Sequence, residues 1–115
     1  MMYATFLSNT QGKEGRILRV RALLIDQVAR EGSDPPNATL NLIKTPKNYK
    51  GIVHSDCFST DIIAVLFGAP LPCVIRQFGE QYQLISQAIV DGFMEGQAIG
   101  MMGRGELEVQ YIELL

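Results

Sequence analysis

The chain contains a single histidine, His54, which is the one side-chain type whose ordinary pKa lies near neutrality. Asp56 follows it two residues later, so in a strand both side chains would share a face. His54 could then act as an oriented donor or a general base, and a solvated loop histidine is the alternative. Because no CxxC or HxxxH spacing accompanies it, the sequence predicts neither a metal site nor a cofactor.

Arg76 interrupts an apolar stretch, residues 72–78, that otherwise has the composition of a strand. It falls on the same strand face as Val74 and Phe78, so an inward orientation would bury its charge. A buried guanidinium needs a carboxylate or a ligand oxygen, because an unpaired buried charge is costly. Two interpretations stay open, namely a donor to a substrate carbonyl and a structural ion pair. The carboxylates considered for that ion pair are Asp61, Asp91 and Glu95.

Two further pairs of charged side chains have spacings that could serve chemistry. Arg19 and Arg21 lie two apart in a strand-like run and could hold a carboxylate between them, although a solvent-facing sheet surface has the same pattern. Asp91 and Glu95 are four residues apart near a short helical segment. Paired carboxylates can perform acid–base work, and a helix cap with a solvated face is the alternative.

Aromatic and methionine side chains could line an apolar pocket, and methionine adapts in shape to an irregular ligand. Core packing is the alternative for each of them, since buried aromatics usually fill the core. The side chains considered for the pocket are Phe58, Phe67, Phe78, Tyr82, Phe93, Met94, Met101 and Met102.

The 115-residue chain is expected to form one domain, residues 1–115, with a small core that leaves little surplus over chain entropy. A homodimer, or a surface that packs on another molecule, would therefore help to stabilise it. The net charge is −2 and the ten basic residues are dispersed, so nucleic acid is not an expected partner.

Targeting and redox signals are sparse. The sequence shows no secretory signal and no apolar run of the roughly 18 residues that a membrane span needs. Two cysteines, Cys57 and Cys73, are too few for a disulfide framework, and the sequence does not say whether they are neighbours in space. These features predict a reduced, cytoplasmic protein without a membrane span.

The stretch from residue 52 to residue 99 dominates the predicted structure. It contains the apolar runs 61–67, 72–78 and 82–90, which are joined by two short Gly-containing turns. Short runs rich in Val, Ile and Phe with such turns between them predict an antiparallel meander. The run 61–67 is apolar almost throughout, as a strand covered on both faces would be.

The flanking segments add further strands. Residues 16–26 alternate with period two and predict a strand, although a helix over 22–30 competes. Near the end, Leu107, Val109 and Tyr111 alternate with polar residues and predict a strand with one wet face. Other expectations are strands over 2–7 and 40–44, a loop over 31–39, a helical turn within 92–99 and a loop over 100–105. The sequence thus predicts a mainly β fold, either a small antiparallel barrel or a two-sheet sandwich, with one or two short helical turns.

The order of these elements resembles the C-terminal region of fungal heterokaryon-incompatibility (HET) proteins. That region has a Gly-Asp-x-Ile strand, a Gly-Ala turn, a Pro-x-Val-Leu-Arg strand and a Tyr-x-Leu-Val strand leading to Tyr-Val-His-Gly-Ile-Met-Asp-Gly-Glu-Ala. Here the corresponding stretches are DIIAVLFGAPLPCVIRQ and YQLISQAIVDGFMEGQAI, and the resemblance covers most of residues 16–115. The family's histidine is Asp91 here and its glutamate is Gln97, and 115 residues are too few to include its signalling domain.

The resemblance implies a function, because fungal natural-product biosynthesis includes small proteins that look HET-like and are used as cyclases. It implies a cofactor-independent cyclase of the intramolecular Diels–Alder type that forms a norbornene from an apolar, terpenoid-like substrate. Such a step needs an apolar cavity that holds a near-attack pose and one or two donors to the dienophile carbonyl. Its expected catalytic side chains are Arg76, His54 and Tyr82. Its expected substrate-binding side chains are Phe58, Phe67, Phe78, Phe93, Met94, Arg19, Arg21 and Asp91.

A non-catalytic protein-interaction or self-association module is the competing hypothesis. The two hypotheses predict different structures. A pocket of several hundred Å³ lined by Phe and Met with Arg76 or Tyr82 at its wall would favour the enzyme. A filled core with an apolar outer patch would favour the module.

Overall fold

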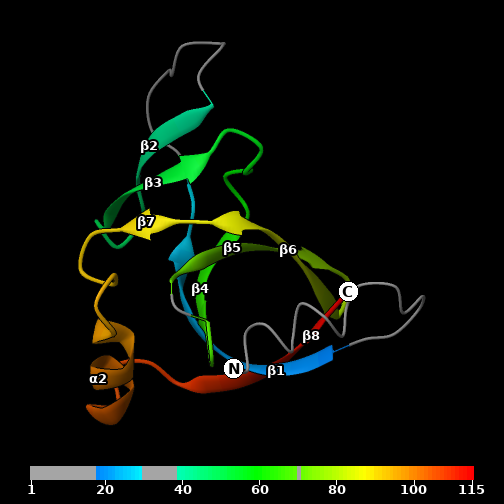
Figure 1. Ribbon diagram of the computed structural model, residues 1–115, viewed down its shortest axis with the longest axis vertical. Coiled ribbons are helices and arrows are strands. Elements are labelled where there is room, and N and C mark those ends of the chain that lie inside the picture. The colour runs from blue at the N-terminus through cyan, green and yellow to red at the C-terminus, as the bar shows by residue number, and fades with distance from the viewer. Residues whose placement is uncertain (1–17, 30–38, 70) are drawn as a thin grey trace.

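The computed structural model describes residues 18–29, 39–69 and 71–115, which form two β-sheets and one short helix (Figure 1). Five strands close a barrel in the order β1-β4-β5-β6-β8. The other three strands form a second sheet in the order β2-β3-β7. The predicted mainly β fold is therefore confirmed, and of the two expected architectures, a small barrel or a two-sheet sandwich, the structure contains a closed barrel. The element bounds are β1 Leu18–Gln27, β2 Leu40–Lys44, β3 Lys50–His54, β4 Ile62–Leu66, β5 Cys73–Phe78, β6 Gln81–Gln87, β7 Ile89–Val90, α2 Gln97–Gly103 and β8 Val109–Leu114.

The barrel is built from an antiparallel meander and one returning strand. β4, β5 and β6 follow one another as the predicted meander, while β1 pairs antiparallel with β4 on one side and with β8 on the other. β6 and β8 meet in parallel where Tyr82 lies opposite Leu114. There the amide of Leu115 donates to the carbonyl of Tyr82 at 2.8 Å. This contact closes the barrel, which is otherwise antiparallel.

Two separate hydrophobic clusters lie on opposite faces of the barrel strands. The barrel interior holds Ala22, Ala64, Cys73, Ile75, Ile112 and Leu114, with Tyr82 and Leu84 packed against them. The outer cluster holds Leu23, Ile25, Ile63 and Val74 from β1, β4 and β5, together with Val53, Val90, Phe93 and Ala98. β1, β4 and β5 are thus covered on both faces, which the apolar run 61–67 predicted for β4.

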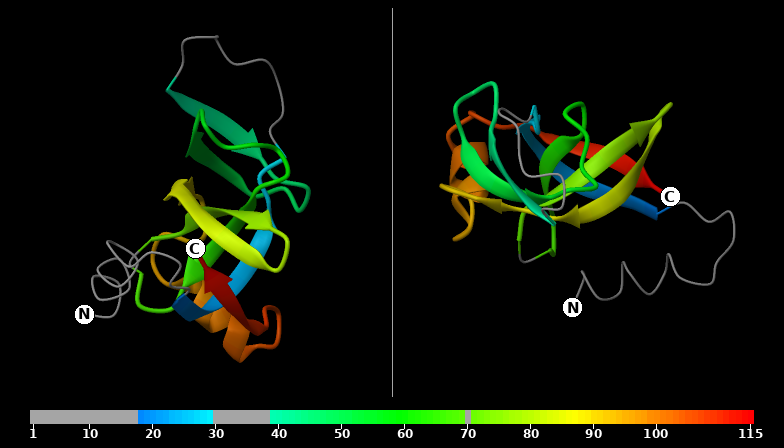
Figure 2. Two further views of the ribbon diagram at one scale, coloured as in Figure 1. Left: turned by 90° about the vertical axis from the view of Figure 1, so that its right-hand side faces the viewer. Right: turned by 90° about the horizontal axis from the view of Figure 1, so that it is seen from above.

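The second sheet is an extension of the barrel (Figure 2). The expected continuous strand over 82–90 divides at Ala88, whose amide donates to the carbonyl of Pro72 at 2.9 Å. β6 stays in the barrel, and β7 leaves it to pair with β3. Gly51 permits this pairing, because a Cβ at that position would lie 2.4 Å from the carbonyl oxygen of Ile89.

Two sequence-based expectations near the C-terminus are wrong. A loop was expected over 100–105, but residues 100–103 belong to helix α2. The helix forms because Ala98 is buried and Met101 and Met102 pack on the outer cluster. Tertiary burial here overrides the low helix propensity of glycine. In β8 the buried face carries Ile112 and Leu114, whereas Val109 and Tyr111 are exposed, since the pairing with β1 points the even-numbered residues into the barrel.

The remaining local expectations are either excluded by the structure or lie outside the described residues. The helix that competed over 22–30 is excluded, because β1 continues to Gln27. The strand expected over 2–7 and nearly all of the loop over 31–39 lie outside the described residues. In the described part of the chain, no helix has the length and apolar character to cross a membrane.

Candidate functional site

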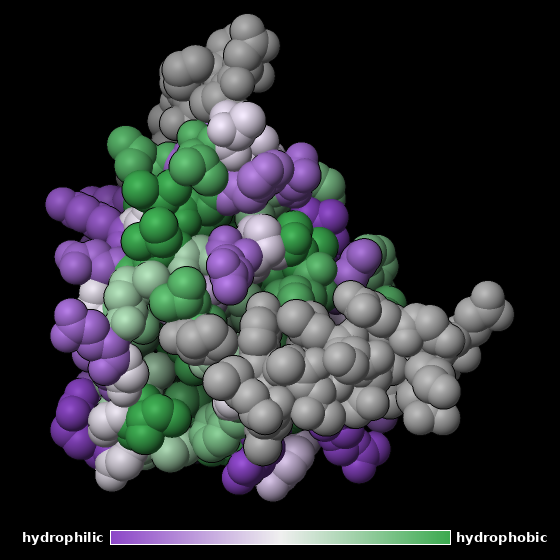
Figure 3. All heavy atoms as spheres, in the orientation of Figure 1, coloured by the Kyte–Doolittle hydropathy of each residue, from purple (hydrophilic) through white to green (hydrophobic). Residues whose placement is uncertain are grey.

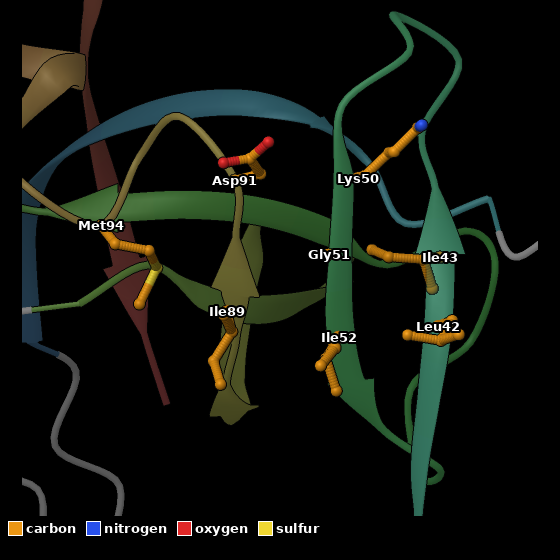
Figure 4. A pocket seen from close by; sticks show the side chains of 8 residues that line it. All are labelled: Leu42, Ile43, Lys50, Gly51, Ile52, Ile89, Asp91 and Met94. Carbon is orange, nitrogen blue, oxygen red and sulfur yellow. The ribbon is translucent and has the colours of Figure 1, made fainter.

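An exposed row of aliphatic side chains crosses the second sheet. Leu42 on β2 lies opposite Ile52 on β3, and Ile52 lies opposite Ile89 on β7. Leu42 is 68% exposed and Ile89 is 52% exposed. Leu40 extends the apolar surface along β2 and is also exposed. We call the side of the β2-β3-β7 sheet that carries Leu40, Leu42, Ile52 and Ile89 the outer face (Figure 4).

The opposite side of the same sheet is also apolar. Ile43, Val53 and Val90 belong to the buried outer cluster of the barrel, as strand alternation requires when Leu42, Ile52 and Ile89 point away. An antiparallel sheet with one buried face normally presents polar side chains on the other. The outer face departs from that rule, and the space-filling view shows apolar atoms gathered over this part of the molecule (Figure 3).

Two shallow depressions meet on the outer face. The first has a volume of about 430 Å³ and shares Ile52 and Ile89 with the second, which has a volume of about 320 Å³. Lys50 and Asp91 supply the charged rim of the first depression, and His54 borders the second. The first is lined by Leu42, Ile43, Lys50, Gly51, Ile52, Ile89, Asp91 and Met94.

Backbone hydrogen bonds hold the segment after β7 against β3. The amide of Asp91 donates to the carbonyl of Lys50 at 2.8 Å, which extends the β3–β7 pairing by one residue. The amide of Val90 donates to Met94 Sδ at 3.3 Å. Asp91, Lys50 and Met94 are therefore fixed at the end of the outer face where β3 begins.

Arg76 is engaged in an ion pair. Its Nε and Nη2 each donate to one carboxylate oxygen of Asp61 at 2.9 Å, and Asp61 is buried. Nη2 also donates to the carbonyl of Asp56 at 2.9 Å, and the Phe58 ring stacks on the guanidinium with its centroid 3.7 Å from Cζ. The hydrogen bonds that Arg76 donates to Asp61 raise the pKa of Arg76 above its ordinary value. The ion pair considered for Arg76 is thus present, with Asp61 as its partner.

His54 lies at the end of β3, next to the outer face. Its Nδ1 accepts a hydrogen bond from the amide of Asp56 at 3.2 Å, and the Asp56 carboxylate lies 3.3 Å from the same nitrogen. Asp56 contacts His54 through its amide and Arg76 through its carbonyl, so two of the three predicted catalytic side chains are bridged by one residue. They line different depressions, however.

The other predicted site residues are dispersed. Tyr82 packs against the barrel interior, and the Phe93 ring meets the Tyr49 ring edge-on at 4.8 Å in the outer cluster. Arg21 lies over the Phe67 ring at 4.7 Å, and Arg19 forms an exposed ion pair with Glu113 at 3.3 Å. The remaining candidates line different surface depressions. Phe58 and Arg76 line one, Asp91 and Met94 a second, and Phe67 and Phe93 a third. His54 borders a fourth without another candidate, and Phe78 is exposed.

Both cysteines are buried free thiols, Cys57 in the outer cluster and Cys73 in the barrel interior. Burial raises the pKa of both, that of Cys73 to about 12. Within residues 18–29, 39–69 and 71–115, no three His, Cys, Asp or Glu side chains gather as metal ligands would.

The residues that form the outer face were missed by sequence reasoning. In β2 the structure buries polar Asn41 and exposes Leu40 and Leu42. Each face of β2 mixes apolar and polar residues, since Leu40, Leu42 and Lys44 lie on one and Asn41 and Ile43 on the other. Alternation therefore carried no signal for this orientation.

Comparison with known proteins identifies no relative of this chain. No protein-family model matches the chain, and no curated protein or solved structure shows significant similarity to it. The resemblance to the tail of HET proteins stays a prediction.

Proposed function

We propose that the chain is a protein-interaction module that binds its partner through the outer face. The exposed row of Leu42, Ile52 and Ile89 carries this proposal, because contiguous apolar surface on a soluble protein marks a site of association. Other exposed apolar side chains have different surroundings. Phe58, for example, stacks on Arg76.

The outer face suits binding because packed side chains support it from beneath. Its strands are held by the buried side chains Ile43, Val53 and Val90 beneath it, so little conformational entropy is lost when a partner covers it. Full burial of an aliphatic side chain contributes about 1.5–3 kcal/mol, and loss of rotational and translational freedom offsets much of that. A small face of this kind supports reversible association. A homodimer in the cytoplasm is one form of such a module.

Face-dependent capture tests the proposal. Wild-type protein, Ile89→Asp and the control Tyr111→Asp are used as baits in extract of the source cells, after circular dichroism has shown that all three are folded. Tyr111 is 71% exposed on β8, outside the outer face, so its substitution introduces the same charge elsewhere. We expect the Ile89 variant alone to lose specific partners, including tagged copies of the chain itself. Identical capture by all three baits would refute the proposal.

A cofactor-independent cyclase for an apolar, terpenoid-like substrate in fungal biosynthesis is the second proposal. The depression of about 430 Å³ supports it, since Leu42, Ile52, Ile89 and Met94 supply an apolar lining of ligand size. Norbornene formation by an intramolecular Diels–Alder reaction is the chemistry that the HET resemblance suggests. In this depression preorganisation of the substrate would provide the rate increase.

Incubation with a linked diene–dienophile terpenoid aldehyde, followed by chiral product analysis, tests the cyclase. A cyclase gives a faster reaction and one dominant adduct, and the Ile89→Asp variant should lose both effects. The same slow isomer mixture with and without protein would refute this second proposal and leave the interaction module standing.

A further inference from the structure

We infer that the partner on the outer face is a second copy of this chain, related by a two-fold axis that runs along β3. This inference rests on the proposed interaction function and names its partner. Two-fold contacts require a surface that is complementary to itself. The charges beside the apolar row provide that complementarity.

The outer face carries two parallel rows of side chains. The apolar row is Leu42, Ile52 and Ile89, in register across the three strands. The second row lies two residues away from the first on each strand. Lys44 is opposite Lys50, and the amide of Asp91 bonds to the carbonyl of Lys50. Side chains two residues apart on a strand share a face, so the charged row, Lys44, Lys50 and Asp91, borders the apolar one.

A two-fold axis along β3 exchanges the two edges of the sheet. It places β2 of one copy over β7 of the other. Leu42 then packs against Ile89 of the second copy, and Ile52 packs against its own equivalent on the axis. Lys44 meets Asp91 of the second copy, and symmetry repeats this pair. Each Lys50 faces its own equivalent across the axis, with Asp91 of its own chain in register beside it as the anion. Its long stem also lets the ammonium group reach solvent.

The alternative axis, across the strands, is incompatible with the charges. It would lay the Lys44 and Lys50 end of one copy on the Leu40 and His54 end of the other. Two lysines would then be covered without an anion, which is unfavourable, and Asp91 would face no cation. Face-to-face sheets pack with strand directions within about 30° of each other. An axis inclined about 15° to β3 gives that geometry.

The dimer should be weak and sensitive to salt. A face of three short strands falls in the low range of interface sizes, below about 1,200 Å² in total. Its two ion pairs lie at the rim, where salt screens them within about 10 Å at 0.1 M. Dissociation should therefore be measurable at micromolar protein and should increase between low and high ionic strength.

A charge exchange tests the axis. Sedimentation velocity is measured over a concentration series for Lys44→Asp, Asp91→Lys and the double variant, with Lys47→Asp as a control on an exposed turn residue outside the charged row. Each single variant should raise the dissociation constant about tenfold or more, as like charges meet. The double variant should return to within about threefold of wild type, and the control should not change. Because symmetry places each substitution in both ion pairs, a tenfold effect corresponds to about 0.7 kcal/mol for each pair.

Three outcomes would overturn the inference in distinguishable ways. A dimer that the double variant fails to restore refutes the axis along β3. A wild-type protein that stays monomeric at all concentrations refutes the second copy as partner. In that case, capture of a different protein by wild type and not by Ile89→Asp would leave the interaction function intact, and equal capture would refute both.

Discussion

Removing Arg76 should cost more stability than removing its buried partner. Asp61 is 1% exposed and accepts three hydrogen bonds, two from the Arg76 guanidinium and one from the amide of Phe58 at 2.8 Å. Arg76→Met preserves the aliphatic stem and leaves a buried carboxylate with a single donor. Loss of one partner from a buried ion pair costs about 3–5 kcal/mol. Since the Arg76 side chain is 21% exposed, water can reach the vacated site, and we expect about 3 kcal/mol.

Asp61→Asn perturbs the same pair from the other side. The amide oxygen can still accept the hydrogen bond from the Phe58 amide, and the guanidinium left behind can turn toward solvent. We therefore expect a smaller loss of about 1.5 kcal/mol, typical of a hydrogen bond to a charged group. The double variant Asp61→Asn, Arg76→Met should lose less than the two single losses combined, because it buries no unpaired charge.

Urea unfolding followed by circular dichroism measures these free energies. A loss of about 3 kcal/mol is large for a domain whose total stability lies within about 5–15 kcal/mol, and the slope with urea should stay constant. If Arg76→Met were no more destabilising than Asp61→Asn, the argument that burial of Asp61 makes Arg76 structurally necessary would be wrong.

Three further predictions concern the packing. Gly51→Ala should cost about 2 kcal/mol, because its Cβ would meet the carbonyl oxygen of Ile89 at 2.4 Å. Amide exchange in β7 should accelerate, and unchanged exchange would contradict the close approach. Phe93→Ala should lower the unfolding free energy by about 3 kcal/mol, and the exposed control Phe78→Ala by less than about 0.5 kcal/mol. Burial raises the pKa of Cys73 from 9.0 to about 12, so the folded thiol keeps its proton where the unfolded thiol loses it. The unfolding free energy should therefore fall above pH 9 by about 1.4 kcal/mol per pH unit relative to Cys73→Ala, and parallel pH curves would refute this.

Local chemistry made the barrel predictable. Period-two alternation, apolar runs and Gly-containing turns identified β1, β2, β4, β5 and β6, although β3 was not predicted. The uninterrupted apolar run 61–67 indicated a strand covered on both faces. An ion pair of Arg76 was also foreseeable, because a charge within an apolar strand requires a partner, but the sequence left Asp61, Asp91 and Glu95 as equal candidates.

Nonlocal packing decided what the sequence could not show. The inward face of β8 depends on its register with β1, and helix α2 forms because Ala98 packs on the outer cluster. The outer face was hidden for the same reason. Burial of Asn41 in place of Leu42 follows from how the hairpin docks, and alternation within β2 is equally compatible with either face inside.

The central claim, that the outer face is the functional surface, can be tested directly by a dilution series of two-dimensional NMR spectra. Amide and methyl signals of Leu42, Ile52 and Ile89 should shift with protein concentration, while those of Val109 and Tyr111 on β8 should stay fixed. Concentration-dependent shifts centred on β8, or uniform shifts across both sheets, would contradict the account.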